Sequence, residues 1–313
     1  MMVRRQYDTI IVGGSYAGLS AALVLGRSLR QVLVIDAGQP ANRQTPHAHG
    51  FLTRDGETPA VLSAIAYEQV SHYPTVQFWT DTVVTAEQAE SKFRVTTAGG
   101  VQFQARKLLL ATGVADIMPD LPGFAECWGR SVLHCPYCHG YEVHGQPLGV
   151  LANGEVGYEM ALHIQHWSDL LTLFTNGPST LTGAQQQMLT QLGVSVVETP
   201  IATLEHKAGM LTALLLTNGN RMRPTAIFAR LPFRQHTDIA TQLGCSLMEN
   251  GLIDATEFGE TSVPGVFAAG DATALFRQVA IAVANGTKAG EWINRELVTD
   301  DLRQRTQPVS IEV

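Results

Sequence analysis

Charged residues are scarce in this chain, and basic ones are the scarcer kind. Of its 313 residues 16% are charged, and 28 acidic against 21 basic side chains give a formal net charge of −7. The chain therefore lacks the basic excess that neutralises a phosphate backbone or an anionic membrane surface. We expect neither nucleic acid nor a membrane among its partners.

Long apolar runs are also absent. No stretch of about 18 apolar residues, the length that spans a bilayer, occurs in the sequence. The N-terminal segment with Arg4 and Arg5 could be mistaken for a secretory signal, but Asp8 and the Gly13-Gly14 turn interrupt its apolar region. We expect no membrane span and no targeting segment.

Cysteine is rare, with four residues at positions 127, 135, 138 and 245. They are too few and too unevenly spaced to form the disulfide framework of a secreted protein of this length. A reducing, cytoplasmic setting fits this usage better. Cys127 and Cys245 match no motif, and we expect them to be small packed residues.

Apolar residues, in contrast, are plentiful and form a repeated pattern. They make up 45% of the chain, which is enough for two packed cores. Apolar runs at residues 7–12 and 31–35, with a helix-like segment between them, predict a strand–helix–strand unit. A second such unit begins at residues 149–151 and ends at 170–174. The sequence therefore predicts an α/β fold with two Rossmann-like nucleotide-binding domains.

The first of these units contains a glycine-rich turn, GGSYAG at residues 13–18. It matches the G-x-G-x-x-G fingerprint of dinucleotide sites, with Ser15 in place of the middle glycine. Gly13 permits the tight turn, Gly18 permits close packing of helix and strand, and the helix N-terminus presents free N–H groups to a pyrophosphate. Asp36, at the end of the next strand, can accept hydrogen bonds from a ribose hydroxyl.

Cys135-Pro136-Tyr137-Cys138 is the most specific motif. Two thiols at this spacing can form a strained, reducible disulfide, and a helix N-terminus beside them would favour the thiolate of one. Such a pair can carry two electrons. The sequence therefore predicts a redox-active dithiol.

Three other interpretations compete for the same motif. Cys135 to His139 matches the C-x-x-C-H pattern of covalent haem, but that haem requires export, which nothing in the sequence indicates. A zinc site would need two more ligands, and His163 and His166 lie farther away than zinc-finger spacing. Two structural thiols fit poorly, because Pro136 and the histidines that flank the motif do not resemble a core segment.

Several motifs in order resemble the low-molecular-weight thioredoxin reductase family. They are the VGGSYAG turn, ATG at 111–113, CPYC, the restarted βαβ unit, and VPGVFAAGD at 263–271 followed by Arg277 and Gln278. The resemblance spans nearly the whole chain and implies a homodimeric flavoprotein. It also implies an FAD domain of residues 1–115 and 243–313, split by an inserted NAD(P)-type domain of residues 116–242 that carries the CxxC.

The resemblance assigns roles to individual residues. Asp271 would hold the ribityl and phosphate region of FAD, and residues 277–279 would approach the isoalloxazine. Cys138 would face the flavin, and Cys135 would exchange with the substrate. The residues expected to bind FAD are Gly13, Gly14, Ser15, Ala17, Gly18, Asp36, Ala111, Thr112, Gly113, Gly270, Asp271, Arg277, Gln278 and Val279.

The chain departs from the family directly after the second cysteine, where thioredoxin reductases usually have an acidic residue. Here His139 is followed by Gly140-Tyr141-Glu142. A histidine, with an unperturbed pKa of about 6.5, can take a proton from a thiol and return it. We expect His139 to be catalytic, with a structural hydrogen bond to the turn as the alternative. The CHGYE stretch resembles FAD-dependent dithiol oxidases that close disulfides in gliotoxin, holomycin and romidepsin.

A second departure concerns the nicotinamide site. The family's glycine turn appears as residues 152–157 (ANGEVG) without its first glycine, and Glu155 in that turn would repel a pyrophosphate. The family's HRR cluster, which binds the 2′-phosphate of NADPH, aligns with Phe174-Thr175-Asn176, and no Arg or Lys lies between Arg130 and Lys207. Use of NADP(H) is therefore in doubt.

Two more histidines, His47 and His49, lie in a segment that passes near the flavin in this family. One interpretation is that one of them contacts the substrate or the flavin. As histidines in a polar loop, however, both are expected to be solvated or structural.

The sequence as a whole predicts an FAD-dependent dithiol/disulfide oxidoreductase that uses the Cys135/Cys138 pair. In the leading version it oxidises a small dithiol and passes the electrons to FAD and then to oxygen or another acceptor. The alternatives are an NADPH-dependent reductase of thioredoxin or a similar protein, and a non-enzymatic flavin redox sensor. The motifs do not specify the substrate.

Overall fold

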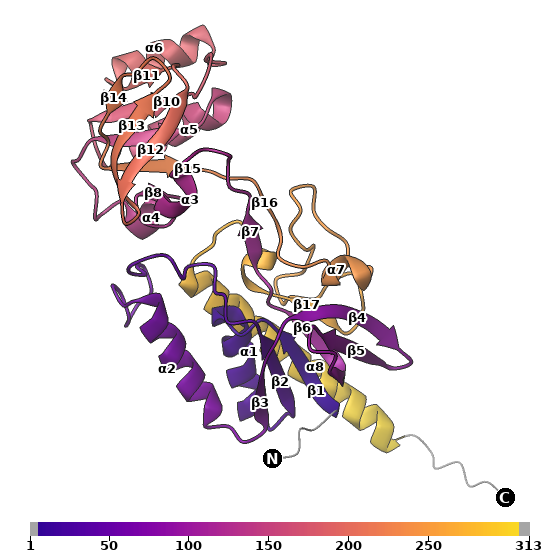
Figure 1. Cartoon of the computed structure of the whole chain (residues 1–313). Helices are drawn as coiled ribbons and strands as arrows, with labels where there is room; N and C mark the ends of the chain where they lie inside the picture. The colour runs from indigo at the N-terminus through magenta and orange to yellow at the C-terminus, as the bar shows by residue number, and fades with distance from the viewer. Residues whose placement is uncertain (1–5, 307–313) are drawn as a thin grey trace, which may run out of the picture. The chain divides into compact units, whose positions relative to one another are not determined.

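The computed structural model describes residues 6–306, so the basic start with Arg4 and Arg5 lies outside it. The chain divides into two compact units. Unit 1 contains residues 1–43, 60–115 and 233–313, and unit 2 contains residues 44–59 and 116–232. Figure 1 shows the elements of both units.

These units differ from the sequence-predicted domains in two segments. Residues 44–59, expected in the FAD domain, lie in unit 2, where His49 forms an ion pair with Glu142. Residues 233–242, expected in the inserted domain, lie in unit 1. There the side-chain amide of Gln235 donates hydrogen bonds to the carbonyl oxygens of Gly251 and Ala272. Long-range contacts therefore decide the unit to which each segment belongs, and no local sequence pattern reveals such contacts.

Unit 1 is built on a seven-stranded sheet in the order β3-β2-β1-β6-β5-β4, with β17 paired to β6. Strands β1, β2, β3, β6 and β17 are parallel, while β4 and β5 form antiparallel pairs with each other and with β6. The strands are β1 (Gln6–Val12), β2 (Val32–Asp36), β3 (Val76–Thr80), β4 (Val83–Ala89), β5 (Lys92–Thr97), β6 (Gln102–Leu110) and β17 (Val266–Ala268).

The central strands are apolar on both faces because both faces are covered. Ile11 and Val34 pack with helices α1 (Tyr16–Arg27) and α8 (Val279–Thr306). Ile10 and Leu33 pack on the other face with residues of β4, β5 and α7 (Ile239–Gln242). Helix α2 (Pro59–Ser71) contributes Val70 to the first core, and η1 is the 3₁₀ turn Gly270–Ala272. Because Val12 is in register with Ile35 and Leu110, three strands end at one edge of the sheet.

Helices α1 and α8 lie side by side with their backbones in close approach (Figure 1). A Cβ on Gly286 would overlap the carbonyl oxygen of Ala17, and one on Gly290 would lie 3.0 Å from that of Ala21. The Ser20 hydroxyl donates a hydrogen bond to the carbonyl oxygen of Val283 at 2.8 Å. Small residues on both helices therefore fix the position of α1.

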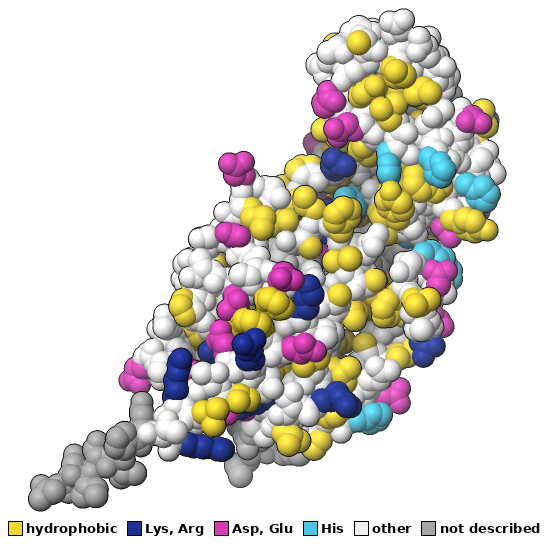
Figure 2. All heavy atoms as spheres, turned by 180° about the vertical axis from the view of Figure 1, so that it is seen from behind, with side chains coloured by type: hydrophobic (Ala, Val, Ile, Leu, Met, Phe, Trp, Pro, Cys, Tyr) yellow, Lys and Arg dark blue, Asp and Glu magenta, His cyan; other side chains and the backbone are white. Residues whose placement is uncertain are grey.

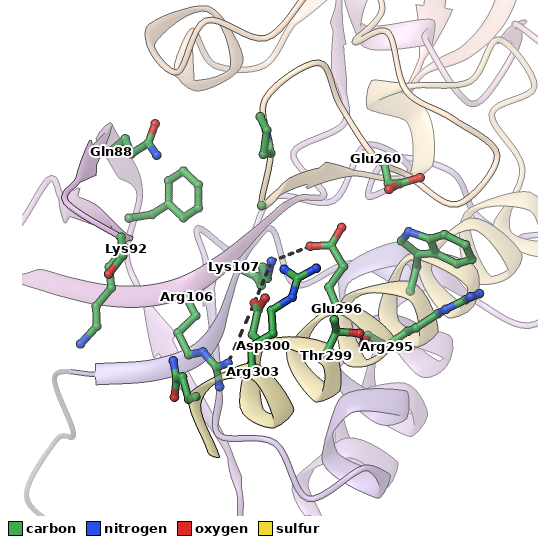
Figure 3. Close-up of a pocket in the computed structure, with 16 residues that line it drawn as sticks. Gln88, Lys92, Arg106, Lys107, Glu260, Arg295, Glu296, Thr299, Asp300 and Arg303 are labelled. Atoms are coloured by element: carbon green, nitrogen blue, oxygen red, sulfur yellow. Dashed lines mark hydrogen bonds and ion pairs between the residues drawn. The ribbon is translucent and has the colours of Figure 1, made fainter. Parts of the chain in front are cut away.

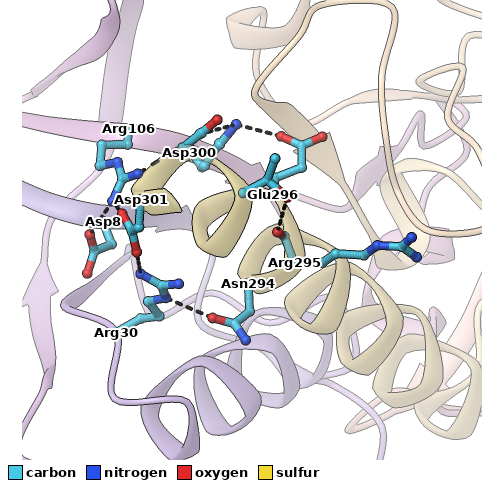
Figure 4. A network of polar contacts seen from close by, with 10 residues as sticks. Asp8, Arg30, Arg106, Asn294, Arg295, Glu296, Asp300 and Asp301 are labelled. Atoms are coloured by element: carbon cyan, nitrogen blue, oxygen red, sulfur yellow. Dashed lines mark hydrogen bonds and ion pairs between the residues drawn. The ribbon is translucent and has the colours of Figure 1, made fainter. Parts of the chain in front are cut away.

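The last turns of α8 are held by an ion-pair network (Figure 4). The Asp301 carboxylate forms two ion pairs: its Oδ2 lies 2.6 Å from Arg30 Nη1, and its Oδ1 lies 2.7 Å from Arg106 Nη1. Lys107, which is 9% exposed, lies 2.5 Å from Glu296. The hydrogen bond from Arg30 is the main reason why the pKa of Asp301 is lowered. A nearly buried lysine is tolerated here because a carboxylate of α8 pairs with it.

Unit 2 contains a five-stranded parallel sheet in the order β11-β10-β9-β15-β8 and a three-stranded antiparallel sheet β12-β13-β14. Its strands are β8 (Val132–Leu133), β9 (Leu148–Leu151), β10 (Leu171–Phe174), β11 (Ser195–Val197), β12 (Ile201–Lys207), β13 (Met210–Leu216), β14 (Arg221–Met222) and β15 (Ala226–Ala229). Its helices are α3 (Phe124–Cys127), α4 (Pro136–His139), α5 (Gly154–Ile164) and α6 (Gly183–Gln191). Strands β7 (Val114–Asp116) and β16 (Phe233–Gln235) form a separate pair.

Each unit thus has the parallel sheet and helices of a nucleotide-binding fold, which confirms the predicted α/β class with two Rossmann-like domains. Within residues 6–306, no helix combines the length and the apolar character that a bilayer crossing requires.

Candidate functional site

A cavity of about 470 Å³ lies in unit 1 where the parallel strands end. This is the edge at which ligands bind in open α/β sheets, and the volume is within the usual range for ligand pockets. All of the residues that the sequence predicts to bind FAD line it, except Gly18. They come from the end of β2, from the segments that follow β1, β6 and β17, from the first turn of α1 and from the start of α8.

The glycines of the first turn are required by close backbone approach. Gly13 has φ +105°, and a Cβ on it would overlap the carbonyl oxygen of Ala111. A Cβ on Gly18 would overlap the carbonyl oxygen of Gly13, which explains why Gly18 lies beneath the cavity and not in its wall. These contacts bring the first turn of α1, whose N–H groups have no intrahelical partner, to the cavity wall.

Asp36 fixes the same turn from the end of β2. Its carboxylate accepts hydrogen bonds from the backbone N–H groups of Gly14 at 2.9 Å and Gly38 at 3.1 Å. A carboxylate has about four acceptor positions, so two stay available for ribose hydroxyls. This arrangement, together with the glycine turn and the cavity, fits a bound dinucleotide such as FAD.

The cavity is also lined by residues that the sequence analysis did not single out, among them Tyr16, Asn42, Tyr67 and His236. The Asn42 side-chain amide donates a hydrogen bond to the Tyr16 hydroxyl at 3.3 Å. Tyr16 occupies a variable position of the glycine motif, and the other three lie outside it. Only Tyr16 could therefore have been found from the motif.

The dithiol lies in unit 2, on the single-turn helix α4. Cys135 is its N-cap and Pro136 its first residue, as expected for a residue with no N–H to donate. The Sγ atoms of Cys138 and Cys135 lie 2.6 Å apart. The close contact with Cys135, then burial and the charge of Cys135, raise the pKa of Cys138. The two sulfurs are therefore already close enough to join with a small movement.

Aromatic side chains and histidines surround this turn. A Cβ on Gly140 would lie 2.6 Å from Trp167 Nε1, so glycine is needed where the turn meets that indole. The Tyr137 ring contacts Trp167 and His163, and His166 also lies against Trp167. Figure 2 shows histidines beside apolar side chains on this part of the surface. His163 and His166 thus belong to an aromatic cluster.

His139, at the end of α4, is half-buried. Burial is the main reason why its pKa is lowered, and the charge of His49 lowers it further, while the charge of Glu142 raises it. His49 Nε2 lies 3.4 Å from Glu142 Oε1, and His49 Nδ1 lies 3.6 Å from Asp55 Oδ1. Of the two roles expected for His49, solvated or structural, the structure shows the structural one: its side chain is 23% exposed and lies between two carboxylates.

His47 has the structural role that was expected. Its Nδ1 is 2.9 Å from the carbonyl oxygen of Gly56 and helps to close the loop of residues 44–59. The other two cysteines are also as expected: Cys127 and Cys245 are buried in core clusters, and burial raises the pKa of both.

The second glycine turn, at the start of α5, is closed by its own side chains. Asn153 Oδ1 accepts hydrogen bonds from the N–H groups of Gly154 at 2.8 Å and Thr180 at 3.0 Å. Glu155 stands in the first turn of the helix and accepts a hydrogen bond from Gln185 at 2.7 Å. A carboxylate at a helix N-terminus compensates the positive end of the helix dipole. The start of α5 therefore carries a negative side chain where a pyrophosphate would be expected to bind.

The segment aligned with the family's phosphate clamp is also engaged internally. Phe174 is 1% exposed and belongs to the core of unit 2. The Thr175 hydroxyl donates to the carbonyl oxygen of Gly177 at 2.7 Å, and Asn176 Oδ1 accepts from the N–H of Ile201 at 2.8 Å. These three residues supply no positive charge to a phosphate.

A larger cavity of unit 1, about 930 Å³, contains none of the predicted site residues. Figure 3 shows Lys107 directed toward Glu296 and Asp300 of α8, with Arg106 beside them. Because these central charges pair with one another, we place the cofactor site in the smaller cavity.

Comparison with known proteins agrees with this geometry. A family model described as pyridine nucleotide-disulphide oxidoreductase matches residues 7–286. Thioredoxin reductase tcpT of Claviceps purpurea is 34% identical and aligns over 94% of this chain and 95% of its own. The crystal structure of an oxidoreductase from Agrobacterium tumefaciens has 36% identity and a TM-score of 0.88, covering 94% of this chain and 99% of the other. That of HlmI has 34% identity and a TM-score of 0.91, covering 97% and 96%.

Proposed function

Because the chain belongs to the pyridine nucleotide-disulphide oxidoreductase family, as a thioredoxin reductase-like flavin-dependent oxidoreductase, we propose that it oxidises a small dithiol through the Cys135/Cys138 pair. In this proposal unit 1 is the FAD domain, and unit 2 is the domain that carries the redox-active cysteines. By resemblance to the family, Cys138 is the thiol that faces the flavin.

The proposed chemistry is thiol–disulfide exchange. A substrate thiolate attacks Cys135 Sγ and breaks the Cys135–Cys138 bond, and the second substrate thiol then displaces Cys135 from the mixed disulfide. The substrate loses two electrons and two protons, and both cysteines end as thiols. FAD, when bound, accepts the electron pair and delivers it to oxygen or another acceptor. His139 takes up a thiol proton, which its lowered pKa favours by keeping the ring neutral before the reaction.

The observation that carries the direction of the reaction is the Phe174-Thr175-Asn176 segment. It stands where the family binds the 2′-phosphate of NADPH, yet it has no cation, and the polar side chains of Thr175 and Asn176 are hydrogen-bonded within the protein. Glu155 adds a negative charge at the adjoining helix start. A protein that cannot bind NADPH well needs another electron donor, and a dithiol substrate is the one that the CxxC can use.

One feature favours a second function, an NADPH-dependent disulfide reductase that acts on thioredoxin or a similar protein. The turn at α5 keeps Gly157, where a Cβ would lie 2.9 Å from the carbonyl oxygen of Ala152. The close strand–helix packing of a nucleotide site is therefore retained, and a weak dinucleotide site can persist at the helix start.

The experiment that tests the proposed function is aerobic turnover of a small dithiol, such as dithiothreitol, by the FAD-loaded protein. We expect formation of the disulfide together with consumption of oxygen or of an added electron acceptor. A flavoprotein whose cysteines change state without turnover would instead be a redox sensor, and the proposal would be rejected.

Assembly and location complete the proposal. The resemblance to the family supports a homodimer, and the few unevenly spaced cysteines support a cytoplasmic setting. Light scattering during size-exclusion chromatography would test the homodimer. Fractionation of the native host cell would test the cytoplasmic setting.

A further inference from the structure

The loop of residues 44–59 is folded so that one histidine meets the segment after the CxxC. The backbone N–H of Ala48 donates to the carbonyl oxygen of Glu57 at 2.8 Å, and that of Gly56 donates back to Ala48 at 3.0 Å. Asp55 accepts a hydrogen bond from the N–H of Gly50 at 2.7 Å. Ala48 is buried, so the neighbouring His49 is attached to an anchored point of the loop.

Glu142 meets His49 from the other side. It follows His139 by three residues, and Gly140 between them has helical backbone angles. Glu142 therefore has two imidazoles as neighbours: His49, whose Nε2 lies 3.4 Å from its carboxylate, and His139, three residues earlier in the chain, whose pKa its charge raises.

We propose that Glu142 and His49 are positioning residues that act through His139, which follows Cys138 on the same single-turn helix: their opposed charges set the protonation state of the His139 ring. This proposal rests on the proposed function, in which His139 is the base for a thiol. When the substrate S–H bond breaks, the proton moves to the His139 ring, and Glu142 stabilises the imidazolium that forms. The same proton then passes to the Cys138 sulfur that leaves the disulfide, so His139 returns to its neutral form.

The two partners act on His139 with opposite signs. The negative charge of Glu142 raises the pKa of His139, whereas the charge of His49 lowers it, and burial lowers it most. Asp55 lies on the other side of His49, with Oδ1 3.6 Å from His49 Nδ1, and the two cysteines precede His139. Tyr137, Tyr141 and His144 are further titratable side chains of the same turn. Removal of Glu142 should therefore lower the pKa of His139, and removal of His49 should raise it.

The test compares Glu142→Gln and His49→Asn in the full-length, FAD-loaded protein. The His139 ring is titrated by NMR in ¹³C-histidine-labelled protein, and its resonance is identified by its loss in His139→Asn. We expect the midpoint pH of the titration to fall in Glu142→Gln and to rise in His49→Asn. The acidic limb of flavin reduction by dithiothreitol should move in the same two directions. If the midpoint moves by about 0.5 in pH, rates on that limb should change about threefold relative to each variant's maximum.

Glu159→Gln and His72→Asn are matched controls, because both side chains are exposed and lie outside the cluster. Unchanged midpoints in both test variants, or midpoints that move in one common direction, would overturn the proposal, since a merely structural role would alter rates without opposed titrations. The NMR titration needs no substrate. Opposed midpoint changes without dithiol turnover would therefore reject the proposed function but keep the proposal for Glu142 and His49. Dithiol turnover without opposed midpoint changes would reject only the proposal for Glu142 and His49.

Discussion

Gly13 and Ala111 approach so closely that position 13 cannot hold a side chain. A Cβ on Gly13 would overlap the carbonyl oxygen of Ala111 and lie 2.8 Å from its carbonyl carbon. Gly13 directly follows β1 and Ala111 directly follows β6, so this contact fixes two strand ends at the edge of the cavity. The shape of the proposed FAD site depends on this approach.

The first prediction concerns that contact. Gly13→Ala should destabilise the protein by about 2–4 kcal/mol and should abolish tight FAD binding, because both a positive φ and a backbone overlap oppose the methyl group. The wild-type protein should be yellow and should release FAD on denaturation, since the cofactor is held non-covalently. Denaturant unfolding and chromatography of the released cofactor measure both effects.

The matched control for this substitution is Gly100→Ala. Gly100 also has a positive φ of 78°, but nothing lies within 4 Å of a Cβ placed there. It should lose stability through backbone strain alone and should keep FAD. Equal loss of FAD in the two variants, or a colourless wild-type protein that FAD does not reconstitute, would contradict the assignment of the site.

The second prediction concerns the dithiol. Cys135→Ser and Cys138→Ser should each abolish dithiol turnover, because one thiol alone cannot store an electron pair as a disulfide. By resemblance to the family, the variant that retains Cys138 should show a long-wavelength charge-transfer band. Cys245→Ala, which alters a buried cysteine outside the motif, should keep turnover. Near-normal turnover in either serine variant would show that the CxxC is not the redox pair.

The third prediction concerns the network at the end of α8. The pKa of Asp301 is lowered in the folded protein, chiefly by Arg30, so its contribution to stability is present above its unfolded pKa of about 3.9 and is lost as pH falls through the folded value. Asp301→Asn should therefore cost about 1 kcal/mol at pH 7 and progressively less below pH of about 4.

Urea unfolding at several pH values measures this difference. Glu291→Gln, an exposed change on the same helix, should leave stability nearly constant across the range. A cost for Asp301→Asn that persists undiminished at acid pH would mean that the carboxylate acts through packing and not through charge.

The sequence predicts best those features that depend on one local segment. Gly13, Asp36 and Asp271 each lie at or just after the end of a parallel strand, so once the strands are recognised, their meeting at one sheet edge follows from the fold. The role of His49 could not be foreseen in this way. It depends on a loop that folds onto unit 2, far along the chain from Glu142, and no periodic pattern reports such a contact.

The nicotinamide site illustrates the same limit. The sequence reports the missing cations at Phe174-Thr175-Asn176, because absence of charge is a property of residue type. It does not report that Asn176 accepts a hydrogen bond from Ile201, or that Asn153 holds Thr180 at the neighbouring turn. Those hydrogen bonds depend on the packing of separate loops at the edge of the second sheet.

The central claim is that a dithiol, and not NADPH, supplies the electrons. Each lost charge-assisted hydrogen bond to a phosphate should cost about 1.5–3 kcal/mol, so the absence of two arginines should weaken NADPH binding by several powers of ten. The most direct test is anaerobic rapid mixing of the oxidised FAD-loaded protein with dithiothreitol, NADPH or NADH, followed by flavin absorbance. We predict fast bleaching by the dithiol and slow bleaching by both nicotinamides. Rapid, saturable bleaching by micromolar NADPH, accompanied by reduction of thioredoxin, would contradict the account and establish the reductase instead.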